Sequence, residues 1–268
     1  MASHEPAQRR LCAVIPPPFI VLRIALILLI LGFWEFAPRF NLIDAANFPS
    51  LSTVVHTLFE LFREQRFLDS LLATAGRVVL AFVIAAPISV VIGIIIAETV
   101  FLDRIVSPYI YLAMAVPQSI FLPIFIFAFG IGTLEKTIYG MTHVALVVLI
   151  NTIAAVRSVP SGYLLAARSF GATPVQIYWK FYVPAMLPSL LTGLRLGLIL
   201  DVIGVLVAEM YASQDGLGQL ILSWSESFRM KEMLGTVLLI SICTIAVNEL
   251  LRGWENHLGR WRASLSER

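Results

Sequence analysis

Three charged side chains lie in or next to one long apolar stretch, where they could bind an ion, carry a proton or select a solute. Arg195 lies near one end of residues 187–207, Asp201 lies nearer the centre, and Glu209 follows the stretch. A charge inside a membrane costs at least about 2–3 kcal/mol unless it is paired or hydrated. Arg195 can extend its charged group to the nearer membrane surface. Asp201 cannot, so we expect it either to pair with a cation on another helix or to line a translocation path.

The motifs of common catalytic and metal sites are absent from the sequence. It contains no GxxxxGK[ST] run for nucleotide binding, no GxSxG nucleophile turn and no HExxH or CxxC motif. Cys12 and Cys243 lie too far apart to suggest a disulfide framework or a metal site. His143 has no carboxylate near it in the sequence, so we expect it to be hydrogen-bonded inside a helical bundle. We therefore predict no catalytic residue, no metal site and no cofactor.

The composition places the chain in a membrane. Of its 268 residues, 59% are hydrophobic and 13% are charged, whereas a soluble domain carries about 25% charged residues. The formal net charge of +2 is too small to indicate a nucleic-acid partner. We therefore predict an all-α protein, a polytopic bundle of about six transmembrane helices in contact with lipid.

Apolar stretches of membrane-spanning length define these helices. They cover residues 19–36, 78–97, 107–129, 137–156, 187–207 and 234–251. A periodic stretch at 51–62 predicts an interfacial helix outside the cytoplasm. Short polar stretches predict a cytoplasmic loop at 98–106, an external turn at Glu135 and Lys136, and an external helix–turn element at 209–232.

Basic residues set the orientation of the bundle. Six spans put both termini and the loop after the fourth span on one side, and that side receives most of the arginines. The positive-inside rule makes this side cytoplasmic. The chain then divides into a cytoplasmic tail (1–18), the first membrane helix with an extracytoplasmic interfacial segment (19–69), the main transmembrane domain (70–251) and a basic cytoplasmic tail (252–268).

Prolines interrupt the third span. Pro117 and Pro123 lie within it, with Gln118 beside the first. Such breaks expose backbone carbonyls and are tolerated where they line a cavity or are buried in protein. Either role fits the sequence, a cavity lining or a kinked packing helix. The candidates for a translocation path are therefore Pro117, Gln118, Pro123, Arg195, Asp201 and Glu209.

The longest amphiphilic interruption of the apolar pattern is the loop at 161–183. It predicts a short helix at 163–170, a turn at Gly171, and a second short helix at 175–182 with Thr173 as N-cap and Pro174 at its first position. Its apolar, aromatic face could rest on lipid or dock into another protein.

This loop closely resembles the cytoplasmic "EAA" loop of permease subunits of ATP-binding-cassette importers, in the branch that imports sulfonates, taurine, nitrate and similar anions. The resemblance covers roughly residues 70–251. In that family the loop inserts into a groove on a separate ATPase subunit. Leu165 stands where the family usually has the Glu of the motif, which removes any polar contact of that Glu. The residues assigned to the ATPase-docking loop by this resemblance are Ala166, Ala167, Gly171, Ala172, Ile177, Phe181 and Pro184.

The resemblance implies a function and a set of partners. The chain would be the non-enzymatic membrane subunit of an ATP-driven importer in the cell inner membrane, with the path formed by a homodimer of permeases. Two ABC ATPase subunits would dock on the loops, and a periplasmic or lipid-anchored solute-binding protein would deliver a small anion. The alternative is a secondary transporter driven by an ion gradient, with Asp201 and Glu209 as the coupling pair. The scarcity of acidic residues in the spans and the lack of an inverted repeat disfavour it.

Overall fold

The computed structural model describes residues 18–159, 161–211 and 213–266. Over these ranges the chain is helical and has no strand, which confirms the predicted all-α class. Five helices are long and apolar enough to cross a membrane, or six if a bent pair counts as one span. In chain order the elements are α1 (Pro18–Arg39), α2 (Leu51–Leu61), α3 (Gln65–Glu98), α4 (Val100–Ala115), the 3₁₀ turn η1 (Gln118–Phe121), α5 (Leu122–Phe129), α6 (Thr133–Arg157), α7 (Ser161–Ser169), α8 (Pro174–Ile177), the π-helical turn η2 (Tyr178–Tyr182), α9 (Val183–Tyr211), α10 (Leu217–Glu226) and α11 (Met230–Ser266).

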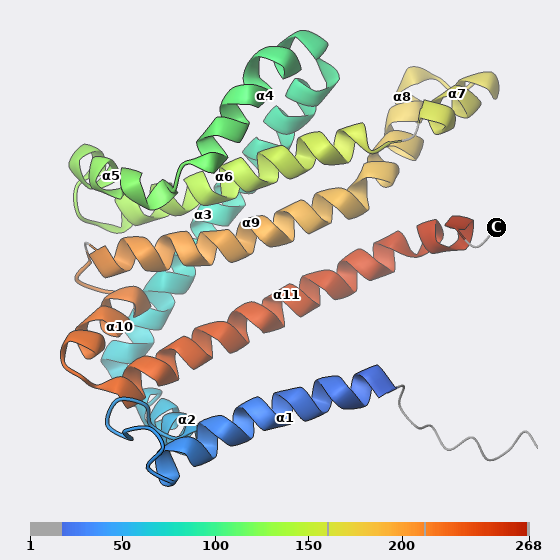
Figure 1. The fold of residues 1–268 in the computed structure, drawn as a ribbon. Helices are drawn as coiled ribbons and strands as arrows, with labels where there is room; N and C mark the ends of the chain where they lie inside the picture. Colours follow the sequence, from blue (N-terminus) through green and yellow to red (C-terminus); the bar gives the residue numbers. More distant parts are fainter. Residues whose placement is uncertain (1–17, 160, 212, 267–268) are drawn as a thin grey trace, which may run out of the picture.

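The centre of the bundle is formed by α6, which packs along both α3 and α9 (Figure 1). Small residues allow these helices to come close. A Cβ added to Gly93 of α3 would lie 2.8 Å from Thr152 of α6, and one added to Gly197 of α9 would lie 2.6 Å from Val148. Both distances are shorter than real contacts, so neither position tolerates a side chain without a shift.

The second span is longer than predicted. Helix α3 begins at Gln65 rather than at residue 78, because residues 65–77 continue the helix and bury one face. Phe67 packs there against Trp224 of α10, with ring centroids 6.4 Å apart. Arg77, which lies just before the predicted start of this span, is buried inside the bundle. The helix predicted at 51–62 is confirmed as α2, while its position at the membrane interface stays a prediction.

The third span is broken, as its prolines predicted. Helices α4 and α5 meet at 88° across the break that contains Pro117, and Pro123 lies in the first turn of α5. The predicted loop at 98–106 is wrong, because α4 already begins at Val100. The charge of Asp103 is accommodated within this helix by the Ser107 hydroxyl, at 2.6 Å, and by an ion pair with Arg157 of α6.

The predicted external turn at Glu135 and Lys136 is also wrong. Both residues lie in the first turn of α6, and both are buried. The Lys136 Nζ donates to the Gly132 carbonyl at 3.1 Å and lies 3.5 Å from the Glu135 carboxylate. Because the two charges are paired with each other, the helix can carry them inside the bundle.

Helix α9 is continuous with the second half of the loop. Residues Pro174–Tyr211 form one apolar helix of 38 residues, where the sequence suggested two helices separated by prolines. Pro184 lacks the N–H that would bond to the Lys180 carbonyl, and Lys180 lies in the wider turn η2, so the missing bond falls at this irregularity. At its other end α9 includes Glu209, which was predicted to lie outside the membrane.

The remaining long helices lie at the periphery. Only 6% of the apolar window of α1 is buried, against 44% for α6. Helix α11 runs from Met230 through most of the predicted basic tail, to Ser266. The start of α1, the end of α11 and the α7–α8 loop lie at one end of the bundle, called the loop end below (Figure 1). Helices α2 and α10 lie at the opposite end.

Candidate functional site

The loop between α6 and α9 has the local geometry that its sequence predicted. Gly171 adopts φ +74°, a left-handed conformation that residues with a side chain rarely adopt. A capping box then starts α8: the Gln176 N–H donates to the Thr173 hydroxyl at 3.4 Å, and the Thr173 N–H donates to the Gln176 side chain at 3.0 Å. The turn and the cap together separate α7 from the continuous helix that begins with α8.

The outer surface of this loop is apolar and aromatic. Phe170 is 90% exposed and Trp179 is 66% exposed, and Val175 and Phe181 are exposed beside them. Leu165, at the position of the family's Glu, is exposed as well. Sequence reasoning named Phe181 but missed Phe170, Val175 and Trp179. The signal that could have identified them is the presence of large apolar side chains in an amphiphilic loop between two spans.

Other residues of the predicted docking loop are less exposed. Ala167 is buried, whereas Ala172, Ile177 and Pro184 are half-buried. The side chain of Ala166 lies outside the described residues. Beside the loop is a cavity of about 710 Å³ that includes Glu98 at the end of α3. The predicted docking residues therefore divide into a buried or half-buried set and an exposed set that contains Gly171 and Phe181.

A buried polar network lies near the opposite end of α9. The Glu209 carboxylate accepts from the Arg77 guanidinium at 2.6 Å, from the Thr74 hydroxyl at 2.8 Å and from the Gly218 N–H at 2.9 Å. Arg77 and Thr74 come from α3, more than 130 residues away in the sequence. Thr74 also accepts from the Leu217 N–H at 2.8 Å. These bonds join α3, α9 and the start of α10.

Arg77 extends this network to the surface. Its second terminal nitrogen lies 2.6 Å from the Asp215 carboxylate, in the turn between α9 and α10. Burial alone would raise the pKa of Asp215, but the hydrogen bond and the charge of Arg77 lower it below its ordinary value. Gly216 is part of the same turn, with φ +100°, and a Cβ there would overlap the Glu209 carboxylate. The contact with Glu209 therefore requires a glycine in the turn between α9 and α10.

Asp201 does not have the cationic partner that the sequence suggested as one alternative. Its carboxylate is fully buried, and neither oxygen has a hydrogen-bond partner among the described residues. It faces α6 at Gly140, where an added Cβ would lie 2.5 Å from the Asp201 Oδ1. His143, one turn further along α6, bonds to the Tyr139 carbonyl at 3.1 Å, as expected of a histidine inside the bundle.

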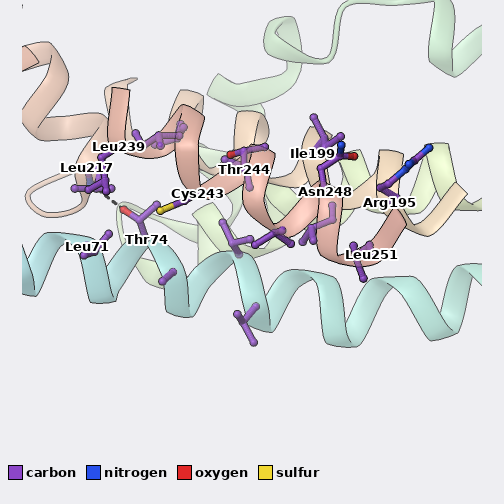
Figure 2. A pocket seen from close by; sticks show the side chains of 18 residues that line it. Leu71, Thr74, Arg195, Ile199, Leu217, Leu239, Cys243, Thr244, Asn248 and Leu251 are labelled. Atoms are coloured by element: carbon purple, nitrogen blue, oxygen red, sulfur yellow. Dashed lines mark hydrogen bonds between the residues drawn. The ribbon is translucent and has the colours of Figure 1, made fainter. Parts of the chain in front are cut away.

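The remaining path candidates lie elsewhere. Arg195 points toward α11, where its guanidinium lies 3.6 Å from the Glu255 carboxylate. It lines a cavity between α3, α9 and α11 that none of the other five candidates lines (Figure 2). Pro117 and Pro123 are exposed at the break between α4 and α5, and Gln118 is half-buried there. One copy of the chain therefore does not gather the six candidates around a single cavity.

Comparisons with known proteins identify the family. Residues 89–263 match the family described as "Binding-protein-dependent transport system inner membrane component". The taurine transport system permease protein TauC of Escherichia coli is 28% identical over 251 residues, which are 92% of this chain and 91% of TauC. The putative aliphatic sulfonates transport permease protein SsuC of Bacillus subtilis is 25% identical over 88% of this chain and 85% of SsuC.

A solved structure supports the fold. A chain of the MetNI methionine ABC transporter, in an inward-facing conformation, superposes with a TM-score of 0.59 at 21% sequence identity. The match covers 75% of this chain and 98% of that chain. The family match extends over more than half of the sequence, and it includes the α7–α8 loop and α9. The chain therefore belongs to the family of binding-protein-dependent transport system inner membrane components, the permease subunits of ABC transporters.

Proposed function

We propose that this chain forms the translocation path of an importer for a small organic sulfonate or a related anion. Membership of the family makes it a multi-pass inner-membrane permease without enzymatic activity, whose ATPase and solute-binding protein are separate chains. The substrate class rests on the relatives named for taurine and aliphatic sulfonates. The single observation that carries the mechanism is the exposed apolar surface of the α7–α8 loop.

This surface is the proposed docking site of the ATPase. Exposed apolar patches bordered by polar residues are typical of protein interfaces, and aromatic residues such as Trp179 commonly supply much of the binding energy. The patch cannot be reached by the bundle itself, because the loop lies beyond the ends of α6 and α9 (Figure 1). Since α8, η2 and α9 form one continuous helix, a displacement of the loop is passed directly into the membrane domain.

The proposed orientation puts the loop end in the cytoplasm, together with both termini. The positive-inside rule supports this, since Arg157, Arg168 and Lys180 lie at that end. A second copy of the chain completes the path, and the bent pair α4 and α5 offers a surface for it. Phe127, near the end of α5, is 90% exposed.

The ion-gradient alternative loses its support. Glu209 is held by three donors in the buried network, so it is not available to exchange an ion. Asp201 lies toward α6 and is not in contact with Glu209. The two acids therefore do not form the coupling pair that a gradient-driven transporter would need.

A copurification experiment tests the docking site. The chain is co-expressed with an ABC ATPase subunit and purified, either unchanged or as Trp179→Asp or Phe170→Asp. An aromatic residue central to an interface commonly contributes about 2 kcal/mol, which corresponds to roughly 30-fold in affinity. We expect both variants to lose the ATPase while they still enter the membrane.

The matched control is Phe59→Asp on α2, which is as exposed as Trp179, at 66%, but lies at the opposite end of the bundle. It is expected to retain the ATPase. Equal retention by all three variants would exclude the α7–α8 loop as the docking site. Uptake of radiolabelled taurine by the reconstituted complex then tests the substrate class separately.

A further inference from the structure

A narrow apolar cavity of about 270 Å³ lies where α3 and α11 diverge on the surface of α9 (Figure 2). Helix α9 packs against both neighbours, but α3 and α11 leave a space between them. Its walls are aliphatic, with Val78 from α3, Val202 and Leu206 from α9, and Ile240 and Val247 from α11. Val79 and Val247 line it and are themselves exposed, so the cavity opens sideways toward the membrane.

The two ends of this groove differ. One end is closed by Thr74 and Leu217, whose hydrogen bond belongs to the buried network. The other end carries Arg195 and Asn248 (Figure 2). After the uncharged stretch of α11 that ends at Asn248, charged residues follow from Glu249 onward. This change indicates that the lipid headgroups lie at this level. The groove is therefore apolar along its length and basic at the end that meets the membrane surface.

Arg195 has unused hydrogen-bonding capacity. A guanidinium carries five N–H donors. Within the part of the chain that the structure describes, Arg195 makes one ion pair with Glu255, at 3.6 Å, which is longer than a hydrogen bond. The same glutamate already accepts from the Thr192 hydroxyl at 2.7 Å. The remaining donors of Arg195 are the groups that bind phosphate oxygens best, since arginine matches their geometry.

The length of the groove fits one hydrocarbon chain. On α11 the lining residues run from Leu239 to Leu251, which is about 18 Å along a helix axis. One leaflet of a bilayer is about 15 Å of hydrocarbon. A helix of about 10 Å diameter would not enter a space of this volume, and a polar solute would find almost no partner along the aliphatic walls.

We propose that this groove binds one acyl chain of an anionic phospholipid whose phosphate is held by Arg195. The lipid fills the space between α3 and α11 and fixes α11 on the bundle. This role is separate from solute transport, because the groove opens toward lipid and is closed by the network at its far end.

The first test uses Cys243, which is exposed and lines the groove (Figure 2). In a Cys12→Ser background Cys243 is the only cysteine of the chain. The purified protein is reconstituted into vesicles of phosphatidylcholine alone or with phosphatidylglycerol, and the rate of alkylation by N-ethylmaleimide is measured. We expect phosphatidylglycerol to slow the reaction at least about tenfold, since charge-assisted hydrogen bonds to the phosphate keep the chain in place.

Variants of the arginine give the second test. Arg195→Gln is expected to abolish the protection, Arg195→Lys to retain part of it, and Arg252→Gln, a nearby exposed arginine on α11, to leave it unchanged. Protection by both lipids equally, or unchanged protection in Arg195→Gln, would overturn the proposal. Protection by taurine in phosphatidylcholine vesicles would also overturn it, because the groove would then be a solute site. Retention of phosphatidylglycerol, measured by native mass spectrometry, is expected to follow the same order.

Discussion

Replacing Arg77 by methionine tests whether the buried network holds the bundle together. Glu209 is fully buried, and Arg77 is its only ion-pair partner in the described structure, at 2.6 Å. Removing one partner of a buried pair leaves an uncompensated charge and typically costs about 3–5 kcal/mol. We expect Arg77→Met to lower the free energy of unfolding by this amount. Glu209→Gln should cost less, because Arg77 keeps Asp215 and the glutamine can still accept from Thr74 and Gly218.

The double variant Arg77→Met/Glu209→Leu separates the pair from its surroundings. Replacing both members of a buried ion pair by apolar residues often changes the free energy of unfolding little. The double variant should therefore be more stable than Arg77→Met alone. The measurement is the unfolding of the purified protein in mixed micelles with increasing sodium dodecyl sulfate, followed by intrinsic fluorescence. A loss below about 1 kcal/mol for Arg77→Met, or additive effects in the double variant, would refute the reasoning.

Three further changes follow from the same structure. Asp201→Asn should leave the free energy of unfolding unchanged or raise it by up to about 1 kcal/mol in the same titration, because the buried carboxylate has no hydrogen-bond partner among the described residues. A clear loss of stability would show that the charge of Asp201 is used. Gly216→Val should lower the free energy of unfolding by at least about 2 kcal/mol, because φ +100° strains a branched residue and the added Cβ would displace Glu209. The control is Gly76→Ala, because Gly76 has open space around it. Arg77 lowers the pKa of Asp215. The ionised Asp215 therefore adds to the free energy of unfolding above the ordinary carboxyl pKa, and this contribution is lost as the pH falls through the lowered pKa. The thermal midpoint should therefore fall below about pH 4, and Asp215→Asn should remove this part of the fall.

The sequence predicted best what depends on neighbouring residues. The turn at Gly171 and the cap at Thr173 follow from the preferences of those residue types, and both are confirmed. The break near Pro117 is confirmed as well, although Pro87, Pro108 and Pro188 lie inside continuous helices, so a proline alone does not fix where a span breaks. The apolar length of the spans was enough to predict a multi-pass bundle.

The errors share one physical cause. Arg77, Glu135, Lys136 and Glu209 were expected outside the spanning helices because each is charged, yet all four lie within α3, α6 or α9 and are buried in the protein. Their partners make this possible, and the partner of Arg77 lies 132 residues away. A single sequence contains no signal for such a pairing, so the ends of α3, α6 and α9 could not be predicted. The position of Asp201 opposite Gly140 is unpredictable for the same reason.

The continuous helix from Pro174 to Tyr211 has different constraints at its two ends. At about 1.5 Å per residue its 38 residues measure about 57 Å. Near Tyr211 the Glu209 network ties it to α3 and α10 by charged hydrogen bonds, whereas the end at Pro174 is exposed. Because α6 packs along α9, the two helices would tilt together about the network, which would act as the pivot of a lever. A tilt of about 10° about the network would sweep the loop through about 10 Å, so a large stroke outside the bundle corresponds to a small angular adjustment within it.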